Sequence, residues 1–146
     1  TQKWVRDVIE EVYSDNDPQH GYSGDEDQGL MGALSVLMKM GLFEMKGGAD
    51  IEPTYDLSSP VFDQIVIHLD KDYYPGERFT IKAQNNSSKN KYIQSLKLNG
   101  TLLNQSWFHH KELVKGGVLE YVLGEEPNYD WATVDEFLPS SMSDQL

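Results

Sequence analysis

The sequence of 146 residues contains no cysteine, no apolar run of membrane-spanning length and few basic residues. The absence of cysteine excludes a disulfide framework and any metal site built on thiolates. No window is long and apolar enough for a membrane span, and the opening residues do not have the pattern of a targeting segment. Twelve basic residues stand against 24 acidic ones, which gives a net charge of −12. This charge argues against nucleic acid and anionic membrane surfaces as partners.

The composition is nevertheless that of a chain that folds around a core. Hydrophobic residues make up 38% of the sequence and aromatic residues 11%, which excludes a wholly disordered chain. The length fits one domain, or the end of a larger one. The first residue is not methionine, and helical periodicity begins at once. We therefore expect a fragment or a processed chain.

Helical periodicity dominates the first third of the sequence. Apolar residues at helical spacing predict one helix over residues 3–14, and a second helix is predicted over residues 28–42. Asp27 is placed to cap the start of the second helix and Gly41 to end it. This second helix is apolar on most faces, so one amphipathic neighbour cannot cover it. Further helices are therefore expected upstream in the same polypeptide.

The periodicity changes to two in the second part of the chain, near Gly47 and Gly48. Alternating apolar residues predict strands over residues 61–70, 78–83, 91–100 and 117–124. Asn99-Gly100 is typical of a tight hairpin turn. The expected fold class is α+β, in which helices are followed by an antiparallel β-sandwich-like region. The expected parts are residues 1–48, the antiparallel β region 49–128 and a polar C-terminal tail, 129–146.

An acidic triplet stands between these two predicted helices. Asp25, Glu26 and Asp27 are adjacent, follow a glycine and precede the apolar run. One interpretation is structural, because acidic residues near a helix N-terminus complement the helix dipole. The other is catalytic or metal-binding, because carboxylates can deprotonate water and bind hard cations such as calcium. A calcium loop of the EF-hand type is disfavoured, since His20 occupies the position that requires glycine.

Histidine and tryptophan are the other candidates for a site. His109 and His110 are adjacent on a predicted strand, so they point to opposite faces and cannot bind one metal ion together. Hydrogen-bonded packing groups are the favoured interpretation for both. The three tryptophans, Trp4, Trp107 and Trp131, could stack on sugars, although scattered tryptophans more often belong to the core.

Two stretches of the sequence resemble glycoside hydrolase family 92. The stretch "HGYSGDEDQGLMGALSVLMKMGLFEM" is similar to the closing helices of that family. The stretch from "FTIKAQNNSS" to "GEEPN", with its W-x-x-H, GG-x-L and PN elements, is similar to the family's C-terminal part. The resemblance covers roughly residues 4–128. Leu30 and Ser58 depart from the family pattern, and neither belongs to the acidic triplet.

The resemblance implies a C-terminal part of an inverting, calcium-dependent exo-α-mannosidase that acts on mannose-containing glycans, with α-1,2 linkages expected. It implies that residues 1–48 hold the last helices of an (α/α)6 barrel with the acidic active-site loop. Asp25 and Asp27 match the aspartates that activate the attacking water, and Asp27 is also the expected calcium ligand. The catalytic acid would come from upstream. The resemblance further implies a periplasmic or secreted parent protein. The alternative is a non-catalytic carbohydrate-binding or structural β module.

Overall fold

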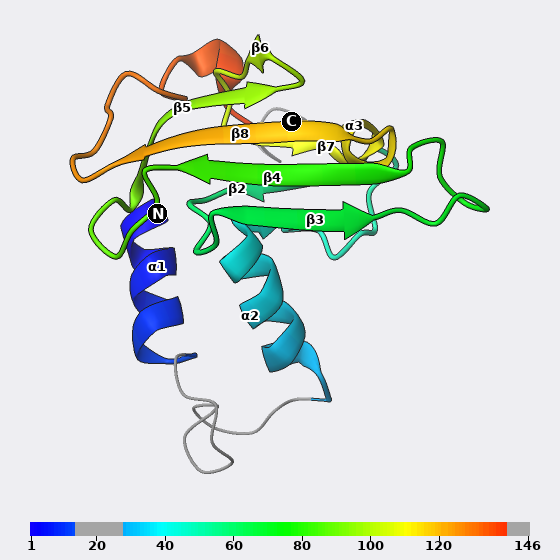
Figure 1. Cartoon of the computed structure of the whole chain (residues 1–146), viewed down its shortest axis with the longest axis horizontal. Helices are drawn as coiled ribbons and strands as arrows, with labels where there is room; N and C mark the ends of the chain where they lie inside the picture. Colours follow the sequence, from blue (N-terminus) through cyan, green and yellow to red (C-terminus); the bar gives the residue numbers. More distant parts are fainter. Residues whose placement is uncertain (14–27, 140–146) are drawn as a thin grey trace, which may run out of the picture.

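The computed structural model describes residues 1–13 and 28–139 of the chain. Two helices, α1 (Gln2–Glu11) and α2 (Leu30–Met40), lie side by side and adjoin a β region made of two sheets (Figure 1). The combination of helices and sheets confirms the α+β class. Within these described ranges, no helix has the length and apolar character needed to cross a membrane.

The β region consists of a three-stranded sheet and a five-stranded sheet. The small sheet has the order β1 (Leu42–Phe43), β2 (Thr54–Leu57), β7 (Trp107–His109). The large sheet has the order β3 (Gln64–His68), β4 (Arg78–Gln84), β8 (Gly117–Gly124), β5 (Tyr92–Leu98), β6 (Thr101–Leu102). A short helix, α3 (His110–Val114), follows β7 directly, and a single 3-10 turn, η1 (Asp135–Phe137), lies near the end of the described chain.

One pairing differs from the purely antiparallel arrangement that the sequence suggested. Strands β4 and β8 are parallel neighbours, whereas every other strand pair among the described residues is antiparallel. A parallel pair needs a long crossover connection. Here the chain forms β5, β6, β7 and α3 before β8 returns beside β4. Local alternation of apolar residues cannot reveal this crossover, because it does not encode strand direction.

The hydrophobic core lies between the two sheets. Along β4, Phe79, Ile81 and Ala83 are buried while Arg78 and Lys82 are exposed, so alternation directs one face of the strand inward. Facing rings join the two layers, since the Phe79 and Phe108 rings stack with centroids 6.0 Å apart. The remaining core residues include Leu42, Leu57, Ile93, Leu96, Leu119, Tyr121 and Leu123.

The helix and turn boundaries test several expectations. Gly41 ends α2 as predicted, with φ 77°. Its backbone N–H donates hydrogen bonds to the carbonyl oxygens of Leu37 and Met38. The Asn99-Gly100 hairpin is also confirmed, because both residues have positive φ between β5 and β6. The N-cap position of α2 is Gly29, and Asp27, which was predicted to cap this helix, lies outside the described residues. Strand β1 begins directly after Gly41, earlier than the expected change near Gly47.

Both helices present apolar side chains that nothing in the described chain covers. Trp4 on α1 is 70% exposed, and Leu30 and Val36 on α2 are also exposed. In α2 the only buried residue is Ser35. Exposed apolar faces of this extent are typical of surfaces that contact another protein segment. The observation fits the expectation of further helices in the same polypeptide.

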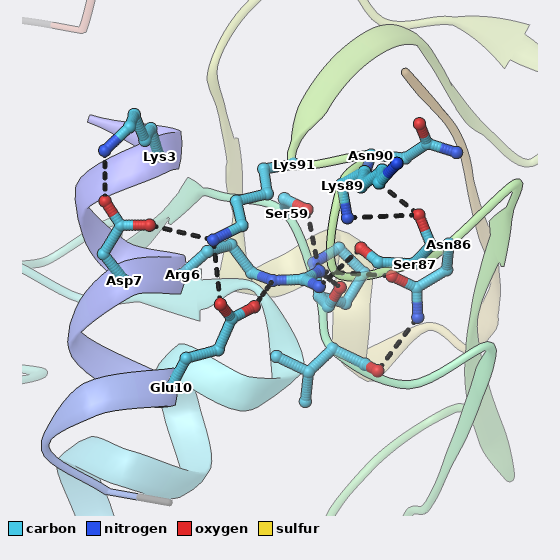
Figure 2. Close-up of polar contacts among 12 residues, drawn as sticks. Lys3, Arg6, Asp7, Glu10, Ser59, Asn86, Ser87, Lys89, Asn90 and Lys91 are labelled. Carbon is cyan, nitrogen blue, oxygen red and sulfur yellow. Dashed lines mark hydrogen bonds and ion pairs between the residues drawn. The ribbon is translucent and has the colours of Figure 1, made fainter. Parts of the chain in front are cut away.

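A buried arginine joins α1 to the β region (Figure 2). Arg6 is only 3% exposed. Its Nη1 donates to Pro60 O at 2.6 Å, to Asn86 Oδ1 at 3.1 Å and to Ser59 Oγ at 3.3 Å, and its Nη2 donates to Ser87 O at 2.9 Å. Burial lowers the pKa of Arg6, and the nearby Glu10 carboxylate opposes this effect. The guanidinium remains charged, because an arginine is not deprotonated in proteins.

A second cation reinforces this connection at its edge. Lys91 Nζ lies 2.9 Å from Asp7 Oδ1 and 2.8 Å from Glu10 Oε2, so it bridges two carboxylates of α1 (Figure 2). The first residue of α1 also takes part, because Gln2 Oε1 accepts from the backbone N–H of Ile93 at 2.7 Å. The helix is therefore fixed to β5 and to the β4–β5 loop along its length.

Removing the Arg6 guanidinium should destabilise the protein more than removing any surface charge of α1. Arg6→Ala leaves several buried acceptors without a donor, so we expect a loss of about 3 kcal/mol in the free energy of unfolding. Denaturant unfolding of the protein that contains this chain measures the change. Lys3→Ala is the matched control, because Lys3 is exposed on the same helix and its loss should change stability much less. Equal effects of the two substitutions would contradict this role of Arg6.

Candidate active site

The acidic triplet that the sequence singled out lies outside the described residues. Asp25, Glu26 and Asp27 belong to the stretch 14–27 between α1 and α2. The structure describes the two helices that flank this stretch, α1 before it and α2 after it. These helices determine where the two ends of the stretch lie.

The residue that follows α1 contacts α2 directly. Tyr13, just after α1, is buried, and its Oη lies 3.5 Å from Met31 Sδ in the first turn of α2. Lys39 Nζ donates to the carbonyl oxygen of Tyr13 at 3.2 Å. The chain therefore leaves α1 and enters α2 at neighbouring points. No local pattern of the sequence indicates this contact, because the two residues are 26 positions apart.

The backbone directly after the triplet has an unusual conformation. Gln28 has φ 61° and Gly29 has φ 95°, so two successive residues before α2 are left-handed. Glycine adopts this conformation readily, whereas glutamine does so at an energetic cost. Such strain is often found beside functional sites. The N-terminus of α2, whose partial positive charge favours nearby carboxylates, follows at once.

The described residues do not form a metal-binding site by themselves. In residues 1–13 and 28–139, no three histidine, aspartate or glutamate side chains lie close enough to hold a metal ion. Asp27, the expected calcium ligand, lies outside these ranges. Calcium takes six to eight oxygen ligands. A calcium site that includes Asp27 would therefore need donors from outside the described residues.

The adjacent histidines have separate surroundings. His110 Nδ1 lies 3.0 Å from Tyr55 Oη, which confirms the prediction of a hydrogen-bonded packing group. His109 contacts the Trp107 ring instead, and its Nδ1 has no hydrogen-bond partner. Among the tryptophans, Trp131 belongs to the core as expected, with Nε1 donating to Leu103 O at 3.0 Å. Trp4 does not, because it is exposed on α1.

Comparison with known proteins gives consistent similarities. The model of the family described as "Glycosyl hydrolase family 92 catalytic domain" matches residues 1–125. A curated relative from Arthroderma benhamiae, described as an uncharacterized secreted glycosidase, is 34% identical over 129 residues. That alignment covers 87% of this chain and 16% of the relative.

Solved structures show the same arrangement of elements. The family GH92 α-mannosidase BT3965 from Bacteroides thetaiotaomicron is 28% identical, with a TM-score of 0.85 over 97% of this chain and 18% of that chain. The inverting mannosidase BT2199 from the same organism is 31% identical, with a TM-score of 0.82 over 97% of this chain and 18% of that chain. The chain thus spans less than one fifth of the length of these relatives.

Proposed function

The chain belongs to glycosyl hydrolase family 92, and we propose that the protein containing it removes terminal α-linked mannose from glycans. The observation that carries the proposal is the family match over residues 1–125, which includes the acidic triplet. The solved relatives of similar fold are titled as mannosidases, which supports mannose as the sugar. We propose α-1,2-linked mannose as the preferred substrate.

The proposed reaction is a single displacement with inversion at the anomeric carbon. In such a reaction one carboxylate deprotonates the attacking water while a carboxylic acid on the opposite side protonates the leaving oxygen. The two carboxyl groups then stand roughly 6.5–9.5 Å apart, which leaves room for the water. Asp25 and Asp27 serve as the base side. One relative is itself described as an inverting mannosidase, which supports this stereochemistry.

The acid side of the reaction is assigned to the upstream part of the same polypeptide. This assignment rests on the family resemblance, in which a glutamate of an earlier barrel segment serves as the acid. The exposed apolar side chains of α1 and α2 support an upstream partner, since Trp4, Leu30 and Val36 have no cover within the described residues. In this proposal the two helices are the last of an (α/α)6 barrel, and Arg6 fixes them to the β region.

Calcium is proposed as the metal of this site, with Asp27 as one ligand. When bound, calcium would polarise substrate hydroxyls and help to distort the sugar ring. The negative charge of the triplet suits such a hard cation. A periplasmic or secreted location is also proposed, supported by the description of the Arthroderma benhamiae relative as secreted.

Neutralising either aspartate should slow hydrolysis without abolishing folding. In the full-length protein, we expect Asp25→Asn and Asp27→Asn each to lower kcat for an aryl α-mannoside by about 10²–10⁴-fold, the usual contribution of a general base. Steady-state kinetics measures the loss. Asp72→Asn is the control, because Asp72 is an exposed carboxylate outside this stretch. Undiminished turnover by both aspartate variants would exclude their role as the base.

Removal of calcium should inactivate the full-length protein reversibly. We expect activity to disappear after treatment with a calcium chelator and to return with added calcium but not with magnesium. Magnesium is smaller and requires near-ideal octahedral geometry, whereas calcium accepts six to eight oxygens. Activity assays measure the loss, and circular dichroism on the same samples shows whether the protein remains folded. Full activity after exhaustive chelation would rule out the proposed metal.

The isolated 146-residue chain should have no glycosidase activity. It carries the base side of the proposed site but lacks the upstream acid, and a lone acidic triplet supplies too few oxygens for tight calcium binding. Mannose release from an aryl α-mannoside, assayed beside the full-length protein, tests the first expectation. Calorimetry with calcium tests the second. Mannose release at an enzyme-like rate would place the catalytic acid within these residues.

A further inference from the structure

A groove of about 510 Å³ lies on the outer face of the small sheet. Strands β2 and β7 pair so that Asp56 faces Trp107 across the ladder, and Thr54 faces His109. The alternate residues of these strands, Tyr55 and Phe108, pack with the core, so the first four side chains lie on the opposite face. The β1–β2 turn and Leu138-Pro139 complete the groove. None of its described lining residues belongs to α1 or α2.

An aromatic wall stands at one side of this groove. The Trp107 indole Nε1 donates to Phe137 O at 3.2 Å, which satisfies its only polar atom and fixes the ring. The His109 ring meets the Trp107 ring edge-on, with centroids 5.2 Å apart and an interplanar angle of 89°. The indole N–H is therefore satisfied within the protein and needs no hydrogen bond from a ligand.

Two polar groups in the groove have no partner. Asp56 makes no hydrogen bond and no ion pair through its carboxylate with any described residue, although it is half-buried. His109 Nδ1 is fully buried and lacks a hydrogen-bond partner. Its nearest carboxylate oxygen, Glu52 Oε2, is 3.9 Å away, which is too long for a hydrogen bond. A ligand in the groove cannot reach this buried nitrogen, so the half-buried Asp56 carboxylate is the unpartnered polar group that it could bind.

The other acidic side chains of the groove already have partners. Glu44 accepts from the backbone N–H groups of Lys46 and Gly48, while Asp50 pairs with the Lys46 ammonium. In the same way, Lys111 Nζ lies 3.2 Å from Glu52 Oε1. Only Asp56 is left, and burial, with a smaller contribution from Glu44, raises the pKa of its carboxyl group. Among the described acidic side chains of the groove, Asp56 is therefore the one whose carboxylate has no bonding partner.

These properties match a neutral ligand that is rich in hydroxyl groups. Hydroxyl groups can donate to the Asp56 carboxylate, while the apolar face of a sugar ring can pack on the Trp107 wall. The volume lies within the ~300–1,000 Å³ of small-molecule sites, which combine aromatic walls with a few polar groups. Within residues 1–13 and 28–139 the groove also lacks the side chains needed to hold a metal ion.

We propose that this groove is a second saccharide-binding site, which holds a hexose unit of a glycan chain through Asp56 and Trp107. The choice of a mannose-containing glycan rests on the proposed function, whereas the saccharide class rests on the groove itself. Such a site would keep a polymeric substrate near the enzyme, because a second contact on one molecule raises the effective concentration at the first. It also gives the β region a carbohydrate-binding role beside the proposed catalysis.

Affinity electrophoresis of the full-length protein in native gels with dissolved α-mannan tests this proposal. We expect the apparent dissociation constant for mannan to rise at least fivefold in both Asp56→Asn and Trp107→Ala. Tyr73→Ala is the matched control, because Tyr73 is 81% exposed on the β3–β4 hairpin, away from the groove. It should leave retardation unchanged. Asp56→Asn preserves side-chain shape, so it remains informative if Trp107→Ala impairs folding.

Two outcomes would overturn the proposal. Retardation of Asp56→Asn within twofold of the unmodified protein would exclude Asp56 from saccharide binding. Unchanged mannan retardation together with lost binding to polylysine would mean that the groove takes a cationic segment. The mannosidase assignment is tested separately, by hydrolysis of an aryl α-mannoside by the unmodified protein. If another glycan retards the protein and no mannoside is hydrolysed, saccharide binding by the groove would be supported. Only the proposed function would then be contradicted.

Discussion

The Arg6 guanidinium is the contact on which the relation between the helices and the β region depends. It is buried, and its donors reach acceptors more than 50 residues away in the sequence. A buried charge is costly unless it is paired and hydrogen-bonded. The acceptors at Pro60, Asn86 and Ser87 therefore constrain where α1 can lie (Figure 2). Because Tyr13 ties the end of α1 to α2, the same constraint extends to both ends of the stretch 14–27.

The helices and the β region of this chain have different roles. The helices, exposed on their apolar faces, flank the acidic triplet, whereas the two sheets form a closed core of their own. The outer face of the small sheet carries the groove around Trp107 and Asp56. In the account proposed here, the helices hold one half of a catalytic site and the β region both supports them and contacts the glycan.

Sequence patterns predicted the local elements well and the long-range relations poorly. Periodicity located both long helices, Gly41 marked the end of α2, and Asn99-Gly100 marked the β5–β6 hairpin, because these signals are local in origin. The parallel pairing of β4 with β8 and the partners of Arg6 depend on residues distant in sequence, so no local pattern contains them. For the site, the family resemblance supplied the roles of Asp25 and Asp27, whereas the unpaired state of Asp56 and His109 required the structure.

The central claim is that this chain supplies the base side of an inverting α-mannosidase. The anomeric form of the first product tests it most directly, because water activated on the face opposite the leaving group must invert the anomeric carbon. Proton NMR of the full-length protein acting on an aryl α-mannoside, recorded before mutarotation, distinguishes the two forms. The account predicts that β-mannose appears first. The initial formation of α-mannose would mean retention, and would contradict the role given to Asp25 and Asp27.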